Sequence, residues 1–325
     1  MKGLGVTVAA GAIDDVLSRH GISHCRVLLH DEVVYTAGRQ DEPLPIHSIR
    51  KSIISALFGQ LVGGGLVCLG STLAELGIDD SPQLTPMEKS AALEDVLASS
   101  SGVYLPLESE TSYDVFSNTA VAWPAHESSL PGTRFHYSNW NFNVLGDIYQ
   151  RVSGNALFVA VDRLLAQPLG FRDWDPLAHG RLVYRSDPLG ATLRYPNYSI
   201  ALSPRDLAKF GQLYRDGGAW QGQQIVPSEW VSRSTRPVMV TGLPDPFGHY
   251  GYLWWVRGDN TTSALPPGSF SAVGIGGQVL SVIPSHGLVI VAMCDNRKGG
   301  NAGMAIPDTV MTAILALDKV ANATP

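Results

Sequence analysis

Strand-forming segments lie at both ends of this chain, and helix-forming segments lie between them. Near the N-terminus, RVLLH and VVYTAG flank an Asp31-Glu32 turn and predict a β-hairpin. Near the C-terminus, QVLSVI and GLVIVAMC flank a Pro-Ser-His-Gly turn and predict a second hairpin, and YGYLWWV (250–256) predicts a further strand. The order predicts an α+β fold, with one antiparallel sheet built from both chain ends and flanked by helices.

The helix-forming segments fill the centre of the chain, where strand signals are few. Helices are predicted over residues 10–20, 48–62, 84–102, 141–154, 156–170, 203–218 and 227–233, and over 307–317 near the end. We therefore expect a discontinuous α/β lobe (1–75 and 200–325) and a mostly helical lobe (76–199), with an active-site cleft between them.

The composition excludes several kinds of partner. The net charge is −6 and no cluster of Lys and Arg occurs, which argues against nucleic acid. No apolar run reaches the length of about 18 residues needed for a membrane span. The first segment reaches Asp14 and Asp15 too soon for a signal peptide, so a cytoplasmic protein is expected. The sequence assigns no oligomeric state.

The cysteine and histidine residues give no sign of a metal site or cofactor. Cys25, Cys68 and Cys294 are far apart in apolar segments and are expected to be buried thiols without disulfides. His20 and His24 have a ligand-like spacing, but Gly21 ends the helix between them, so metal binding is not expected.

The segment PLPIHSIRKSII places one of only six lysines at the start of an apolar helix. Ser48 and Lys51 are three residues apart and share one face of that helix. A buried lysine must be paired or neutral, and moving its pKa from about 10.4 to about 7 costs roughly 4–5 kcal/mol. Such an amine can activate a serine nucleophile, and the serine N–H can bind an oxyanion. Alternatively, Ser48 is only a helix N-cap and Lys51 extends to water.

Two further segments contain candidate site residues. In LPGTRFHYSNWNFNVLG, Tyr137 and Asn139 are two apart in extended chain and point the same way, which suits a proton shuttle beside an amide. Tyr195-Pro196-Asn197 has the same spacing. In FSAVGIGGQVLSVIP, small residues precede a strand, so the N–H of Ile275 could face an oxyanion; a bulged edge strand is the alternative.

Together the three segments resemble the β-lactamase-related serine hydrolases. That family includes class C β-lactamases, penicillin-binding proteins, esterases and 6-aminohexanoate-dimer hydrolases, and the motif pattern is most similar to the last group. Other segments resemble the family in the same order, from about residue 10 to 315: LTPMEKSAALEDVLASSSGVY, AQPLGFRDW, LSPRDLAKFGQLYRDGGAWQGQQIVPSEWV and GGQVLSVIPSHGLVIVAMCDN. The resemblance selects Tyr137 over Tyr195.

The resemblance implies a role for each motif residue. Ser48 would be acylated, Lys51 would take its proton or tune its partner, and Tyr137 would relay a proton to the leaving group and later help to activate water. Asn139 would orient the substrate and Lys51. The N–H groups of Ser48 and Ile275, the latter between Gly274 and Gly276, would form the oxyanion hole.

One position departs from the family pattern and bears on the substrate. β-Lactamases and peptidases usually have Lys or His where this chain has Ala272, and that cation helps to hold a substrate carboxylate. The resemblance therefore implies a small neutral ester or amide rather than a β-lactam. Tyr104, Tyr113, Trp254 and Trp255 are candidates for the pocket wall.

Other functions remain open at this point. A transacylase would use the same acyl-enzyme with an acceptor other than water, and a penicillin-binding or sensor-type domain would turn over little. A Ser-His-Asp arrangement with His126, His136 and Asp114 is a further alternative. The sequence contains no Gly-x-Ser-x-Gly motif and no phosphate-binding glycine loop.

Overall fold

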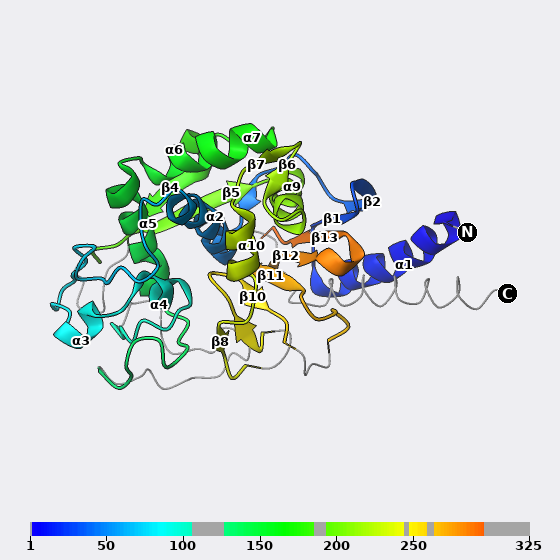
Figure 1. Cartoon of the computed structure of the whole chain (residues 1–325). Coiled ribbons are helices and arrows are strands. Elements are labelled where there is room, and N and C mark those ends of the chain that lie inside the picture. Colours follow the sequence, from blue (N-terminus) through cyan, green and yellow to red (C-terminus); the bar gives the residue numbers. More distant parts are fainter. Residues whose placement is uncertain (1, 106–126, 185–192, 244–246, 259–262, 296–325) are drawn as a thin grey trace.

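The computed structural model describes residues 2–105, 127–184, 193–243, 247–258 and 263–295 (Figure 1). Its main feature is an antiparallel eight-stranded sheet in the order β2-β1-β13-β12-β11-β10-β9-β8. The N-terminal strand β1 pairs with the C-terminal strand β13, with Cys25 opposite Ala292. The prediction of an α+β fold with one sheet built from both chain ends is thus confirmed. The strands are β1 (His24–Leu29), β2 (Glu32–Ala37), β8 (Met239–Val240), β9 (His249–Tyr250), β10 (Trp255–Val256), β11 (Phe270–Gly274), β12 (Gln278–Ile283) and β13 (Leu288–Met293).

Helices cover both faces of this sheet, which explains why the C-terminal strands read as continuous apolar runs. In β13 every residue is buried. Leu288, Ile290 and Ala292 pack in a cluster that contains Ile13 of α1 (Lys2–His20). Val289, Val291 and Met293 pack in a second cluster that contains Phe210 of α9 (Pro204–Arg215). Alternate side chains of a strand point to opposite faces, so β13, which is covered on both sides, is apolar at every position.

The segment YGYLWWV is a hairpin turn between β9 and β10, not the single strand that was expected. The N–H of Gly251 donates to the carbonyl of Trp254 at 2.8 Å, and Leu253 has a positive φ of 67°. Two hydroxyls of helix α2 (Arg50–Gly63) bind this turn. Ser52 donates to the carbonyl of Leu253 at 2.7 Å, and Ser55 donates to that of Tyr252 at 2.8 Å. These bonds from a helix distant in sequence satisfy the carbonyls that a continuous strand would have paired.

The longer helices follow the prediction except at residues 84–102, and the short helix α8 (Pro176–His179) was not predicted. Two short helices replace the single one expected there, α3 (Pro86–Lys89) and α4 (Leu93–Leu97). Each has its own start: Thr85 and Glu88 form a capping box, and the N–H of Ala92 donates to Asp95. The other helices are α5 (Asn139–Ser153), α6 (Leu157–Val161), the π-helical turn η2 (Asp162–Ala166), α7 (Gln167–Leu169), α8 (Pro176–His179) and α10 (Ser228–Ser234). In Figure 1 the cyan and green helices α3 to α7 lie on one side of the molecule, and α1 lies on the other.

A second, three-stranded sheet was not predicted. Its order is β3-β5-β4, with β3 (Leu44–Pro45), β5 (Asn197–Leu202) and β4 (Gly180–Val183). In β5 buried residues alternate with partly exposed ones, a period-two pattern that was present in the sequence NYSIAL. The sheet ties the segment just before Ser48 to the middle of the chain. The division into two lobes stays a prediction. A two-stranded ribbon, β6 (Ala219–Trp220) and β7 (Gln223–Gln224), completes the described strands.

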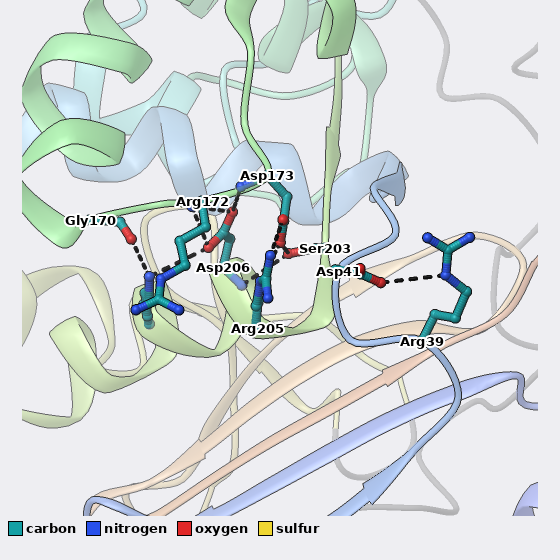
Figure 2. Close-up of polar contacts among 9 residues, drawn as sticks. Arg39, Asp41, Gly170, Arg172, Asp173, Ser203, Arg205 and Asp206 are labelled. Carbon is teal, nitrogen blue, oxygen red and sulfur yellow. Dashed lines mark hydrogen bonds and ion pairs between the residues drawn. The ribbon is translucent and has the colours of Figure 1, made fainter.

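A buried carboxylate fixes the start of α9 to the loop that follows α7 (Figure 2). The side chain of Asp206 is fully buried and accepts the backbone N–H groups of Arg172 and Asp173, at 3.0 and 2.8 Å. The Asp173 carboxylate in turn accepts the Ser203 hydroxyl at 2.6 Å and the Arg205 guanidinium. These bonds hold two segments that are about thirty residues apart in a fixed geometry.

Three smaller expectations can be compared with the structure. Cys25 and Cys294 are buried as expected, whereas Cys68 is exposed because it lies in the loop after α2 rather than in an apolar strand. Among the described residues, no helix is long and apolar enough to cross a membrane. In the same part of the chain no three His, Cys, Asp or Glu side chains gather as a metal site would require. The helix expected at 307–317 lies outside the described residues.

Candidate active site

Ser48 lies in a short 3-10 turn, η1 (His47–Ile49), that leads directly into α2. It is half-buried. Neither η1 nor α2 has a side-chain cap at its N-terminus, so the interpretation of Ser48 as a helix N-cap is wrong. His47, directly before it, has a positive φ of 47°, a backbone conformation that non-glycine residues adopt at a cost of order 1 kcal/mol or more.

Lys51 is buried, with only 2% of its surface exposed, so it does not extend to water as the alternative interpretation required. Its amine donates to the Tyr137 hydroxyl at 2.7 Å and to the Asn139 carboxamide oxygen at 3.2 Å. The nitrogen also lies 4.0 Å from the centre of the Tyr137 ring and 3.7 Å from that of Phe142. The two sequence motifs, one around Ser48 and one around Tyr137, therefore meet at this amine.

An aromatic cluster holds the Tyr137 ring in place. Trp255 is stacked on it with ring centres 5.3 Å apart and planes at 24°, and Tyr250 lies edge-on to it at 6.1 Å. Phe142 packs against a further part of the ring at 4.8 Å. A ring confined in this way presents its hydroxyl in one direction.

The adjacent tryptophans have different surroundings, and the sequence did not distinguish them. Trp254 has no exposed surface and packs in the core against Phe210, Tyr214 and Phe270, so the structure does not support its place in a pocket wall. Trp255, the next residue, is the one on Tyr137. Trp254 lies in the turn and Trp255 begins β10, so only the packing of this hairpin decides which of the two meets the site.

Strand β11 ends against the turn that carries Ser48. A Cβ on Gly274 would lie 2.5 Å from the Ile46 carbonyl oxygen and 3.1 Å from the His47 Cβ, so only glycine fits there. Ile275, directly after the strand, is 66% exposed, and Gly276 follows with a φ of 78°. Ala272 is buried in the core. The predicted third segment thus lies beside the first.

The second Tyr-x-Asn segment has a structural role. The Tyr195 hydroxyl donates to the Asp79 carbonyl at 2.6 Å, and the Asn197 carboxamide oxygen accepts Arg50 Nε at 3.0 Å. The resemblance that favoured Tyr137 is therefore consistent with the observed contacts.

Two of the remaining candidates, Tyr104 and His136, lie in the described part of the chain and touch each other. Tyr104 is buried and meets the His136 ring edge-on at 5.3 Å. Burial, together with the nearby Arg134 charge, lowers the pKa of His136 to about 4. Tyr113, Asp114 and His126 lie outside the described residues.

Comparison with known proteins places these residues in a family context. A 6-aminohexanoate-dimer hydrolase of Paenarthrobacter ureafaciens is 29% identical over 167 residues, covering 49% of this chain and 38% of that protein. The esterase EstB of Burkholderia gladioli is 29% identical over 177 residues, covering 49% of this chain and 45% of that protein. The match therefore spans less than half of each of these two relatives.

A solved structure shows the same fold over nearly the whole chain. It is EstCE1, described as a hydrolase with promiscuous acyltransferase activity; the TM-score is 0.67, the identity is 15%, and the match covers 96% of this chain and 98% of that one. The family model described as Beta-lactamase matches residues 20–313. With the fold, the matched length and the resemblance of all three segments in agreement, the chain belongs to the Beta-lactamase family.

Proposed function

We propose that the protein is a serine hydrolase that cleaves a small neutral ester or amide through an acyl-enzyme on Ser48. The observation that carries this proposal is the buried Lys51 amine, one helical turn from Ser48 and 2.7 Å from the Tyr137 hydroxyl. Burial of a lysine beside a phenol and a serine is costly, and such an arrangement suits proton transfer.

In the proposed reaction, Lys51 accepts the proton of Ser48 Oγ as that oxygen attacks the substrate carbonyl carbon. The N–H groups of Ser48 and Ile275 receive the developing oxyanion. Tyr137 delivers a proton to the leaving alcohol or amine as the carbon–heteroatom bond breaks. Water then attacks the acyl-enzyme and gives up a proton to the same Lys51–Tyr137 pair. The pair returns a proton to Ser48 Oγ as the acyl–oxygen bond breaks, which releases the acid and restores the serine.

The proposed substrate class rests on Ala272 and on the relatives. Ala272 supplies a buried methyl group where family members that bind a substrate carboxylate usually have a cation. The names of the two relatives refer to a 6-aminohexanoate dimer and to esters, which supports acyl transfer from an amide or an ester. A neutral acyl group is therefore the better match to the chemistry of this position.

A transacylase is the second candidate, because the solved structure with the same fold is described as having acyltransferase activity. Both candidates share the acyl-enzyme and differ in the acceptor. Incubation with p-nitrophenyl butyrate, with and without a primary amine or alcohol, separates them. Sustained release of p-nitrophenol supports the hydrolase, and acceleration by the acceptor supports the transacylase.

The same experiment tests whether there is an enzyme at all. A burst of one equivalent without turnover indicates a sensor-type domain. Intact-protein and peptide mass spectrometry must then find the butyryl group on Ser48. Acylation at any other residue, or no acylation with p-nitrophenyl esters, amides and a penicillin, would remove the proposal.

A further inference from the structure

Arg50, the residue directly before Lys51, is a buried cation with its own set of contacts. Only 2% of its surface is exposed. Its Nε donates to the Asn197 carboxamide oxygen at 3.0 Å, and its Nη2 donates to that of Asn143 at 3.3 Å. Asn143 lies on α5 and Asn197 is the first residue of β5, so one guanidinium joins α2 to two other elements.

The contacts of Arg50 and Lys51 form a matched pair along α5. Lys51 donates to Asn139, and its neighbour Arg50 donates to Asn143. Asn139 and Asn143 are four residues apart on one helix and therefore lie on the same face, one turn from each other. Two contacts one turn apart add to the core packing of α2 on α5 and oppose both rotation and sliding of one helix against the other.

The asparagines are themselves held. Asn143 is buried and its amide donates to the Tyr195 carbonyl at 3.4 Å, while the Tyr195 hydroxyl donates to the Asp79 carbonyl. The segment Tyr195–Asn197, which resembles the Tyr137 motif in spacing, thus forms part of the cradle for Arg50. A planar guanidinium can donate to two acceptors in fixed directions, which the flexible ammonium of lysine does not reproduce.

The charge of Arg50 also reaches the turn that carries Ser48. Burial is the main cause of the low pKa of His47, and the Arg50 charge lowers that pKa further. His47 directly precedes Ser48, so a fixed positive charge acts close to the reacting groups. A positive charge at this place opposes protonation of any nearby base.

We propose that Arg50 is a positioning residue for the reaction: it helps to set the register of α2 against α5, so that the Lys51 amine meets Tyr137 and Asn139, and it places a fixed positive charge beside the turn that carries Ser48. This inference rests on the proposed function. Asn143 and Asn197, which bind Arg50, would then do more than join α2, α5 and β5: they would help to place the Lys51 amine.

The test compares Arg50→Met, Arg50→Lys and Asn143→Ala with the wild type, using the rate of Ser48 acylation by p-nitrophenyl butyrate as a function of pH. We expect Arg50→Met and Asn143→Ala each to lower kcat/KM about 10- to 100-fold, since a displacement near 1 Å can cost that much. KM should change little. In Arg50→Met the acid limb of kcat/KM should also move to higher pH, because a positive charge is lost. Arg50→Lys should lower the rate but leave the limb in place.

Two comparisons separate positioning from stability. The double variant Arg50→Met/Asn143→Ala should be no slower than the worse single variant, because both remove one contact. Arg205→Met is the matched control, because it removes a guanidinium that binds Asp173 beyond the opposite end of β5 (Figure 2). This variant should lower the thermal midpoint but leave the acid limb of the kcat/KM profile at the wild-type pH.

The outcomes distinguish this inference from the proposed function. If the wild type is acylated on Ser48 and folded Arg50 variants react at the wild-type rate with an unchanged pH profile, Arg50 is only structural and the inference is wrong. If Arg50→Met does not fold, the acylation rate of Asn143→Ala decides the question, because that variant removes the Arg50–Asn143 contact from the other side. If the wild type is not acylated on Ser48, the proposed function fails, and this inference fails with it.

Discussion

The amine of Lys51 and the hydroxyl of Tyr137 are 86 residues apart in the chain and 2.7 Å apart in the structure. Lys51 is held by the start of α2, and Tyr137 is held by stacking on Trp255. The contact therefore depends on two separate parts of the fold. It places a potential base and a potential proton donor at one point, one helical turn from a serine.

Replacement of the proposed nucleophile tests the reaction directly. We expect Ser48→Ala to lower turnover by roughly 10⁴ to 10⁶. The thermal midpoint should change little, because the Ser48 side chain caps neither η1 nor α2. Ser52→Ala, four residues on, is the matched control. It removes the bond to the Leu253 carbonyl and should cost about 1 kcal/mol of stability while turnover persists. A folded Ser48→Ala protein with a near-normal rate would exclude the mechanism.

The proton chemistry of Lys51 is tested by a change that keeps the charge. Arginine does not deprotonate near neutral pH. Its guanidinium group is also larger than the lysine amine, and Lys51 is so deeply buried, with 2% of its surface exposed, that there is little room for the larger group. We expect Lys51→Arg to lose at least ~10²-fold in acylation rate. Lys89→Arg, which alters an ion pair with Asp79, should have little effect. Stopped-flow acylation across pH gives the measurement. Equal rates and profiles for Lys51→Arg and wild type would show that Lys51 transfers no proton.

The neutral side chain of Ala272 predicts a preference among substrates. With no cation at this position, a carboxylate beside the scissile bond should gain little binding energy. We expect kcat/KM for neutral p-nitrophenyl esters to exceed that for penicillins by several orders of magnitude. A pair of esters that differ only by a terminal carboxylate provides the matched comparison, and the neutral one should react faster. Efficient penicillin hydrolysis would contradict the assignment of the third motif.

Half-buried His136 predicts a pH dependence of stability. Its pKa falls from 6.5 to about 4 on folding, so between these pH values the unfolded chain binds the proton and the folded protein does not. Stability contributed by the neutral ring is therefore present above pH 6.5 and is lost as the pH falls toward 4, by at most about 1.4 kcal/mol per pH unit. Partial exposure of the ring makes the measured slope smaller. Urea unfolding at several pH values should show a flatter profile for His136→Phe.

The control for this experiment is His20→Gln at the exposed end of α1. That variant should retain the wild-type slope between pH 6.5 and 4. If His136→Phe has the wild-type slope as well, protonation of His136 is not coupled to unfolding, and other groups cause the acid sensitivity.

Replacement of the buried Asp206 carboxylate by an amide is expected to cause a large loss of stability. An amide group at this position cannot accept from both backbone N–H groups with the strength of a carboxylate. We therefore expect Asp206→Asn to lower the free energy of unfolding by about 2–3 kcal/mol. Asp15→Asn removes an exposed ion pair with Arg19 and should change the free energy of unfolding by less than about 0.5 kcal/mol. Calorimetry or urea unfolding measures both, and equal stabilities would show that the Asp206 bonds contribute nothing net.

Much of the secondary structure could be predicted because local chemistry determines it. The hairpins near both ends have alternating or continuous apolar residues with a short turn, and α5 and α9 have caps at their starts. The spacing of Ser48 and Lys51 also has a local meaning, because residues three apart in a helical segment share a face. The resemblance of the three motifs to one enzyme family then indicated that they meet in one site, which the local sequence of each motif could not show.

Other features depend on contacts between distant segments. YGYLWWV forms a turn rather than a strand because Ser52 and Ser55 of α2 bind its carbonyls. The small sheet forms because β3, β4 and β5 come together from three parts of the chain. Which of two adjacent tryptophans meets Tyr137 depends on the face that the packed sheet turns toward the site.

The candidate site shows the same division. The sequence by itself determined that a serine, a lysine, a tyrosine and an asparagine are present at spacings suited to acyl transfer. Only the tertiary structure decided that Lys51 is buried, that its amine lies 2.7 Å from the Tyr137 hydroxyl, and that Arg50 binds Asn143, one turn along α5 from Asn139. The physical reason is that helix geometry fixes distances within one turn, whereas the distance between segments 86 residues apart is set by the packing of the whole core.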